Sequence, residues 1–459
     1  MKNSNLVLFD SATRKKHVFL PTDHKRVTMY ACGPTVYSYP HIGNYRSTVV
    51  FDQLFRVLRH KYGVDSVVYA HNHTDIDDKI IHASQETGEP IGVITAKYSA
   101  VYRDESHKLN VLPPTVVTMA TDYVDRMISM VCELLEKGFA YVTEGHVLFA
   151  IEQFDGYGSF SGINREEMLA GARVEVASYK QNPADFVLWK PSKDDEPGWD
   201  SPWGRGRPGW HLECSAMIEH ELGQTIDIHG GGQDLRFPHH ENEIAQSSCA
   251  HGGAPLARYW MHNGFINMGT DKMSKSLGNI IIMHDLLREW HGEVLRFSLL
   301  SAQYRQPFDW TDGLLEQSKQ QLDRFYRLLR EAPDVPVSTP PQDVVVALHD
   351  DLNTPVAIAV LHALRDTAMQ LTGSARIEAI ASFRAAGELL GLFAEDPVKW
   401  FEAGRADDLA EGEIERLIAE RNKAKKERDF ATADRIRKHL STNSVILEDS
   451  QTGTTWRRK

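Results

Sequence analysis

The feature of this sequence that most limits its possible folds is a strand, a glycine-containing loop, a helix and a second strand in immediate succession. Residues 27–31 (Val-Thr-Met-Tyr-Ala) are predicted to form a strand, and residues 43–60 carry apolar side chains at the spacing of a helix with one buried face. A glycine then ends the helix, and residues 67–69 begin a second strand. Two strands joined through a helix lie parallel in one sheet. The first domain is therefore predicted to be α/β.

The rest of the chain is expected to divide into further parts, because 459 residues are too many for one domain. Glycine, proline and tryptophan become frequent after a helix predicted at residues 122–138, which indicates an irregular insertion. Strand signals nearly vanish after residue 280, so the remainder is predicted to be helical. The expected parts are an α/β domain formed by residues 1–140 and 211–280, an irregular insertion at residues 141–210, and helical regions at residues 281–332, 342–400 and 410–459.

Composition excludes several classes of protein. Hydrophobic residues make up 42% of the chain and charged residues 25%, as in a folded globular protein. No apolar run approaches the roughly 18 residues that a membrane span needs, so we expect a cytoplasmic protein without membrane contact. The few cysteines do not make a disulfide framework, which leaves burial, metal binding or catalysis as their roles. These cysteines are Cys32, Cys132, Cys214 and Cys249.

Charge is distributed unevenly along the chain. A formal net charge of −12 argues against a protein that coats nucleic acid without specificity. Residues 421–459, however, contain 11 basic and 5 acidic residues. A basic end on an acidic body predicts a polyanionic partner that is bound at this end only.

Two short loops carry residues suited to nucleotide chemistry. Residues 40–44 (Pro-His-Ile-Gly-Asn) lead into the first helix, where unpaired N–H groups and the helix dipole attract a phosphate. Residues 272–276 (Lys-Met-Ser-Lys-Ser) place two lysines where they can stabilise a departing pyrophosphate. The glycine patterns of the Rossmann cofactor loop and the P-loop are both absent. Taken singly, the first loop would be interpreted as a helix cap and the second as solvated surface.

Metal-binding residue types come from three distant segments. Cys32 precedes the first loop, and Cys214 follows a Trp-His-Leu-Glu segment. His239 and Glu243 are four residues apart and share one face if a helix begins at Pro238. Two thiolates, an imidazole and a carboxylate suit zinc. Structural zinc sites use closely spaced ligand pairs, so ligands this far apart favour a functional metal.

Other residues compete for these positions. His240 is an alternative ligand, but its spacing of three to Glu243 predicts that it points away from the face of His239. Cys132 and Cys249 have no comparable cluster near them in sequence and are predicted to be small buried hydrophobic residues.

The two loops, in this order and roughly this far apart, resemble the HIGH and KMSKS motifs of the class I aminoacyl-tRNA synthetase family. Asn44 takes the last place of the first motif, whereas the second motif matches in all five residues. The metal-ligand set and further stretches resemble the cysteinyl branch of that family over essentially the whole chain. These stretches are residues 30–44, 73–79, 185–190, 210–214, 231–243, 350–355 and 421–456.

The resemblance implies a fold and an activity. The fold would be a Rossmann-like parallel-sheet catalytic domain split by an insertion and followed by all-α helical domains: a stem-contact region, a bundle and an anticodon-binding module. The enzyme, which we expect to be a monomer, would activate L-cysteine with ATP and Mg²⁺ and transfer it to the terminal adenosine of tRNA(Cys). One Zn²⁺ per chain would be held by Cys32, Cys214, His239 and Glu243, with the substrate thiolate as an added ligand. Shape alone rejects serine by only about 10², whereas zinc prefers sulfur to oxygen.

The resemblance and the chemistry of single side chains assign the remaining site residues. The residues expected to be catalytic are His41, Lys272 and Lys275. Those expected to bind ATP are His41, Asn44, Gly231, Asp234 and Lys275, and those expected to bind the amino acid are Trp210 and Thr74. Phosphate contacts and base stacking are expected from Arg421, Lys425, Arg428, Trp456 and Arg457. A loop-packing role for Trp210 and a structural turn at residues 231–234 remain the alternatives.

Two other functions fit part of the pattern. A ligase that passes activated cysteine to an amino-sugar would share the metal and nucleotide loops, but it should lack the basic end. A non-catalytic zinc-containing tRNA-binding protein would not explain the intact lysine loop at residues 272–276.

Overall fold

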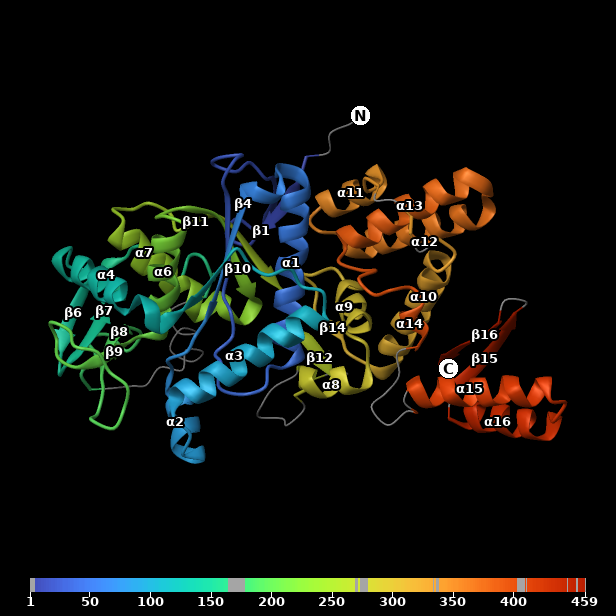
Figure 1. Ribbon diagram of the computed structural model, residues 1–459. Coiled ribbons are helices and arrows are strands. Elements are labelled where there is room, and N and C mark those ends of the chain that lie inside the picture. The colour runs from blue at the N-terminus through green and yellow to red at the C-terminus, as the bar shows by residue number, and fades with distance from the viewer. Residues whose placement is uncertain are drawn as a thin grey trace.

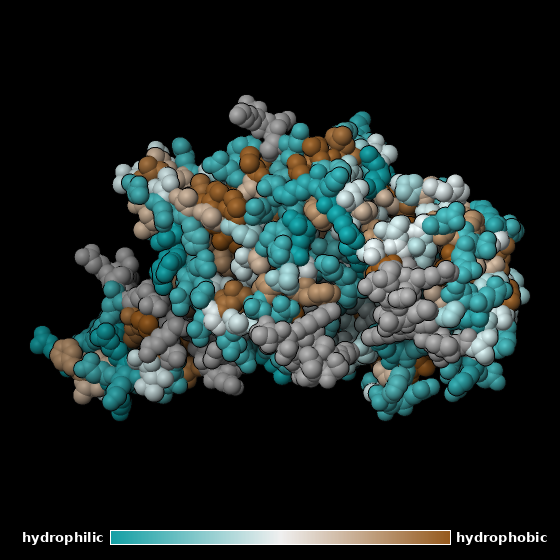
Figure 2. All heavy atoms as spheres, turned by 180° about the vertical axis from the view of Figure 1, so that it is seen from behind, coloured by the Kyte–Doolittle hydropathy of each residue, from teal (hydrophilic) through white to brown (hydrophobic). Residues whose placement is uncertain are grey.

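The computed structural model describes residues 5–163, 178–268, 271–272, 280–332, 334–335, 338–402, 409, 411–443, 445–450 and 453–458. The expected residue Lys275 lies outside them. Figure 1 shows the central sheet with helix α1, the insertion on one side and the helical regions on the other. Of the described helices, none is long and apolar enough to cross a membrane. Figure 2, the view from behind, shows a largely hydrophilic surface with scattered hydrophobic patches.

Five parallel strands form the central sheet in the order β11-β10-β3-β4-β5. Their bounds are β3 Val27–Ala31, β4 Val67–His73, β5 Val116–Met119, β10 Ile226–Gly232 and β11 Ala257–Asn263. Helix α1 (Ile42–Tyr62) connects β3 to β4, which confirms the predicted strand–helix–strand unit. The chain runs outward from β3 to β5 on one side and from β10 to β11 on the other. The boundary between β3 and β10 is thus a topological switch point, where α/β sheets bind their ligands.

Two hydrophobic cores cover the two faces of this sheet. Along β3, Met29 belongs to the core shared with α1, whereas Tyr30 and the following Cys32 belong to the other core. This alternation follows from the period of two along a strand. The first core includes α1, α9 (Gly292–Leu300), α10 (Asp312–Leu329) and the later helices. The second includes α4 (Val124–Glu136), α6 (Trp210–Glu221) and α7 (Glu241–Ala250).

The insertion differs from its prediction. Residues 141–210 were expected to be irregular, but the structure contains a four-stranded antiparallel sheet there, in the order β6-β7-β8-β9. The strands are β6 Ala140–Thr143, β7 His146–Phe149, β8 Phe186–Pro191 and β9 Gly206–Pro208. The prediction was wrong because these strands are short, and because long segments rich in turn-forming residues precede β8 and β9. Further described elements are α2 Asp78–Thr87, α3 Ile91–Lys108, α8 Met283–Glu289, β12 Ile266–Met268, β13 Asp271–Lys272 and β14 Phe308–Asp309.

The chain after residue 340 consists of helices and one C-terminal hairpin. A second hairpin, from the N-terminal end of the chain, is formed by β1 (Val7–Asp10) and β2 (Lys15–Val18), and its Val7 pairs with Asp350 just after the first of these helices. The helices are α11 Gln342–His349, α12 Thr354–Gln370, α13 Gly373–Leu389, α14 Lys399–Glu402, α15 Glu411–Lys426 and α16 Phe430–Thr442. A hairpin of β15 (Val445–Ser450) and β16 (Gly453–Arg458), which helical spacing did not predict, follows α16 and completes a separate small core with α15 and α16.

Glu293, in the first turn of α9, provides a test of the packing between helices. It is 2% exposed and accepts hydrogen bonds from Tyr326 Oη at 2.8 Å and Phe393 N at 2.9 Å. Burial raises its pKa to about 7, although these bonds oppose the shift. Between about pH 4.5 and pH 7, Glu293 is therefore protonated in the folded chain and ionised in the unfolded chain. Stability contributed by this proton is lost as the pH rises through this window.

We expect the free energy of unfolding of the wild-type chain to fall between pH 5 and pH 8 by about 2 kcal/mol more than that of Glu293→Gln, which cannot titrate. Urea unfolding of both chains at the two pH values measures the difference. An equal pH dependence in the two chains would contradict it.

Candidate active site

A cavity of about 1030 Å³ opens at the carboxyl ends of the central strands. Its lining includes several of the predicted site residues, namely Cys32, His41, Asn44, Trp210 and Asp234. Thr74 and Gly231 are buried next to this lining. The cavity thus lies at the switch point of the sheet and is bounded on another side by residues of the insertion, such as Tyr157 and Phe186.

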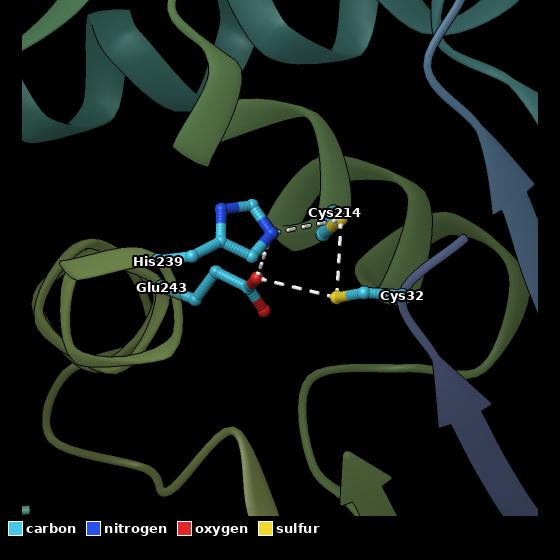
Figure 3. A group of neighbouring side chains, drawn as sticks. All are labelled: Cys32, Cys214, His239 and Glu243. Atoms are coloured by element: carbon cyan, nitrogen blue, oxygen red, sulfur yellow. Dashed lines mark hydrogen bonds and ion pairs between the residues drawn. The ribbon is translucent and has the colours of Figure 1, made fainter. Parts of the chain in front are cut away.

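The four predicted metal ligands converge in one place. Figure 3 shows Cys32, Cys214, His239 and Glu243 directed toward one another from the end of β3, from α6 and from the start of α7. The two Sγ atoms are 3.7 Å apart, Cys214 Sγ is 3.6 Å from His239 Nε2, and Glu243 Oε1 is 2.7 Å from that nitrogen. All four ligand atoms lie within 4.8 Å of one another. Tetrahedral zinc with its usual bond lengths separates its ligands by about 3.3–3.8 Å. The residue types and the two distances from Cys214 Sγ fit this ion, whereas the 2.7 Å between Glu243 Oε1 and His239 Nε2 is that of a hydrogen-bonded ion pair.

Local backbone features place these donors. Cys32 directly follows β3, and Cys214 is in the second turn of α6. Phe237 has non-helical dihedral angles, and the chain becomes helical after it. His239 and Glu243 therefore lie on successive turns of one face, as the sequence predicted.

The buried carboxylate of Glu243 is ionised. Burial alone would raise its pKa, but His239 and His229 hold this pKa well below its usual range. His229 Nε2 lies 2.6 Å from Glu243 Oε2. Burial lowers the pKa of His239, yet Glu243 and Cys214 outweigh burial and raise it to about 10. Glu243 and His239 thus form a buried ion pair, and a metal ion that bound both residues would displace the proton of His239.

Three further histidines lie around the cluster. His240 is placed differently from its prediction, and His229 and His262 were not predicted. His240 does not point away from the cluster, because its Nε2 lies 3.4 Å from Cys32 Sγ. Its Nδ1 is 2.7 Å from His262 Nε2. Among the described residues, Cys32, His229, His240 and Glu243 form a second possible donor group. His229 lies in the middle of β10, next to β3, and its place on a strand that ends in the triple glycine before His239 is the signal that could have identified it.

The predicted amino-acid-binding residues occupy different depths. Trp210 is 37% exposed in the cavity, and its ring stacks on that of His239 at 4.2 Å between centroids. Thr74 is buried and donates its hydroxyl hydrogen to Glu213 Oε2 at 2.9 Å. Trp210 can therefore contact a ligand and orient His239, whereas Thr74 supports the wall behind it.

The predicted nucleotide residues lie around the start of α1. Asn44 Oδ1 accepts from His41 N at 3.1 Å, so the asparagine caps the helix at the position where the motif usually has histidine. Asp234 lines the cavity, whereas Gly231 is packed close to Cys32. The backbone of Lys272 pairs with Asn267 in the β12–β13 hairpin.

The predicted RNA-binding residues require correction. Arg421 is 2% exposed and donates two hydrogen bonds to Asp449, at 2.9 and 2.7 Å. Trp456 is 6% exposed inside the small C-terminal core. Neither can contact RNA as predicted, because the terminal hairpin folds against α15 and α16. Lys425 and Arg428 are exposed, and the side chain of Arg457 lies outside the described residues.

An exposed aromatic residue in this region was missed. Phe430, the first residue of α16, is 63% exposed. It follows Arg428 across a tight turn, where the arginine has a φ of 61°. An aromatic ring beside exposed cations is the arrangement that binds unpaired bases.

Comparison with known proteins adds independent findings. Residues 18–320 match the family model of the tRNA synthetases class I (C) catalytic domain, and residues 343–394 match that of the DALR domain. The chain is 54% identical over 459 residues to a cysteine–tRNA ligase of Maricaulis maris, covering 99% of both chains. It is 55% identical over 458 residues to one of Parvibaculum lavamentivorans, covering 98% of this chain and 97% of the relative. The methionyl-tRNA synthetase of Mycobacterium tuberculosis has a similar fold, with a TM-score of 0.58 at 13% identity over 83% of this chain and 94% of that one.

Proposed function

Because this chain belongs to the cysteine–tRNA ligases of the class I tRNA synthetase family, we propose that its buried Cys/His/Glu cluster selects the substrate thiol and that the adjoining cavity is the site of adenylate formation. The observation that carries the proposal is the convergence of Cys32, Cys214, His239 and Glu243 beside that cavity. These residues would hold one Zn²⁺, which binds and deprotonates a thiol far more readily than a hydroxyl.

The residues of the cavity would orient the reactants. Trp210 forms one wall and stacks on His239, which restricts the ring of this ligand. At the start of α1, His41 faces the cavity and would stabilise charge on the α-phosphate of ATP together with the positive end of the helix dipole. Asp234 would accept a hydrogen bond from a ribose hydroxyl. Lys272 and Lys275 would stabilise pyrophosphate, and Mg²⁺ would accompany the ATP phosphates.

No protein nucleophile is required in this scheme. The cysteine carboxylate attacks the α-phosphate with loss of pyrophosphate, and a hydroxyl of the terminal adenosine of tRNA(Cys) then attacks the adenylate carbonyl with loss of AMP. Positioning and electrostatic stabilisation are sufficient for both steps. The exposed Lys425, Arg428 and Phe430 would bind the anticodon loop at the other end of the same tRNA. We also propose that the enzyme acts as a monomer in the cytoplasm.

The two rival functions are not supported. The relatives that cover 97–99% of their own length are cysteine–tRNA ligases.

ATP–pyrophosphate exchange with cysteine and with serine, before and after chelation, tests the proposed site. We expect serine to be at least about a hundredfold poorer, because shape alone accounts for about that factor and the metal adds to it. Chelation should lower the cysteine-dependent rate, and added Zn²⁺ should restore it. Exchange that persists after complete metal removal, or that accepts serine equally well, would refute the assignment of the cluster.

A further inference from the structure

Arg46 lies on α1, one turn beyond the first nucleotide loop, and is 1% exposed. Its guanidinium donates to three main-chain carbonyl groups. Nη1 donates to Phe265 O at 2.6 Å, and Nη2 donates to Tyr304 O at 3.2 Å and to Gln306 O. The guanidinium also lies 4.4 Å from the centroid of the Phe308 ring. One side chain of α1 thus binds two separate segments of the chain.

These two segments form the base of the hairpin that leads into the second nucleotide loop. Phe265 directly precedes β12, which pairs with both β13 and β14. Gly264 lies so close to the other segment that an added Cβ would be 2.6 Å from Arg305 O. The base of the hairpin therefore cannot shift without moving the partners of Arg46. Lys272 is the last residue of β13, at the start of the second loop.

The chain beyond the second loop is also tied to the start of α1. Ile42 N donates to Ile281 O at 2.9 Å, and Met283 N donates to Pro40 O at 3.2 Å. These main-chain bonds hold residues 281–283, which come after the second loop, against the start of α1. Arg46 is the side-chain connection that holds the hairpin before the loop.

The carbonyl partners of Arg46 are themselves held from the opposite side. Asp351 accepts from Tyr304 Oη and from Arg305 Nε, both at 2.8 Å. Asp351 has a φ of 57°, a left-handed conformation that non-glycine residues rarely adopt. Because Asp351 holds residues 304 and 305 from the opposite side, the carbonyl groups that Arg46 binds in this segment have fixed positions.

From this geometry we propose that Arg46 is a positioning residue for adenylate formation, which sets the distance between His41 at the start of α1 and Lys272 at the start of the second loop. This distance decides whether the first loop and the start of the second loop can act on one ATP molecule. The inference rests on the proposed ATP-binding roles of His41 and Lys272. It assigns to Arg46 no contact with substrate, because the arginine is buried behind the wall of the cavity.

A role in stability alone would not require a charge here. Burial lowers the pKa of Arg46 to about 10, which reflects the free-energy cost of placing a guanidinium in the protein interior. An apolar side chain would fill the same space without that cost. Three fixed carbonyl oxygens, in contrast, define an orientation that the planar fork of arginine matches and a lysine ammonium does not.

Arg46→Lys in the full-length enzyme tests the inference. We expect kcat for cysteine-dependent ATP–pyrophosphate exchange to fall about 10- to 100-fold, because displacements of about 1 Å have effects of this size. The KM for cysteine and the zinc content should change by less than about twofold, since uniform binding of cysteine is untouched. Single-turnover transfer from preformed cysteinyl-adenylate to tRNA should proceed at nearly the wild-type rate.

Arg56→Lys is the matched control. Arg56 lies on the same helix and also donates to main-chain carbonyls, those of Glu388 and Asn110, but it does so away from the hairpin. We expect a comparable loss of thermal stability with kcat unchanged. A wild-type kcat for Arg46→Lys, or losses of kcat in both variants that scale with their melting temperatures, would overturn the inference.

Two further variants distinguish a failure of the inference about Arg46 from a failure of the proposed function. If Arg46→Lys does not fold, Phe308→Leu removes the ring beneath the guanidinium and should lower kcat about threefold; an unchanged kcat would count against the inference. His41→Ala measured in parallel tests the proposed function itself. Full exchange by His41→Ala would refute the ATP-binding role of the first loop, whereas lost exchange by His41→Ala with full exchange by Arg46→Lys would refute only the role of Arg46.

Discussion

Replacing Cys214 with serine is expected to lower cysteine-dependent ATP–pyrophosphate exchange by roughly 10²- to 10³-fold. Structural zinc sites bind with about 10–16 kcal/mol, so each of four ligands contributes about 2.5–4 kcal/mol, which corresponds to roughly this factor. Cys214 is 1% exposed and lies within 3.7 Å of Cys32 Sγ, so a serine oxygen would occupy nearly the same place. The loss therefore reports the weaker affinity of zinc for a hydroxyl. Exchange rates and zinc content per chain measure it.

Cys249→Ser is the matched control for this variant. Cys249 is 5% exposed and lies on the same helix as Glu243, but among the described residues it belongs to neither donor group. We expect reduced stability with exchange within about twofold of wild type, because only packing is altered. Retention of zinc and activity by Cys214→Ser, or equal losses in the two variants, would contradict the assignment of Cys214 as a ligand.

Removing residues 409–459 is expected to lower kcat/KM for tRNA charging at least about a hundredfold while leaving pyrophosphate exchange within about twofold. Stacking contacts of the kind offered by Phe430 contribute about 1–3 kcal/mol each, and 2.7 kcal/mol is already a hundredfold. The two large cores contain no residue beyond Phe401 among those described, and the C-terminal elements have a core of their own. Strand β16 also packs against α14, so the melting temperature of the shortened chain is measured as well.

Full-length variants distinguish the surface of this module from its interior. Phe430→Ala should raise the KM for tRNA about tenfold, whereas Trp456→Phe, a conservative change inside the core, should leave it nearly unchanged. A larger effect of Trp456→Phe on the KM for tRNA would show that the indole, and not the exposed phenylalanine, contacts RNA.

The α/β core could be predicted because its signals are local. Residues 27–31 were predicted as a strand and have those bounds in the structure, and the helix predicted at residues 43–60 spans Ile42–Tyr62. The donor cluster could be predicted because few side chains bind zinc and this chain has only four cysteines. The i, i+4 spacing of His239 and Glu243 then required only that a helix begin near Pro238.

The other features depend on contacts that no local pattern encodes. His229 and His262 lie on neighbouring strands, and only the order of β10 and β11 in the sheet brings them near Cys32. Trp456 looks like an exposed tail residue until β15 and β16 pair and turn it inward. The insertion strands were missed because their pairing partners are up to about 40 residues away, beyond any periodic signal.

The alternation of side chains along β3 decides which face of the sheet the thiol of Cys32 reaches. Met29 and Ala31 face one core, whereas Tyr30 and Cys32 face the other. Deleting one residue before Cys32 would move its thiol to the opposite face of the sheet without changing its identity or its neighbours in sequence. The proposed selection of sulfur over oxygen therefore depends on the register of a five-residue strand, and deletion of a single residue there should abolish it as completely as loss of the cysteine itself.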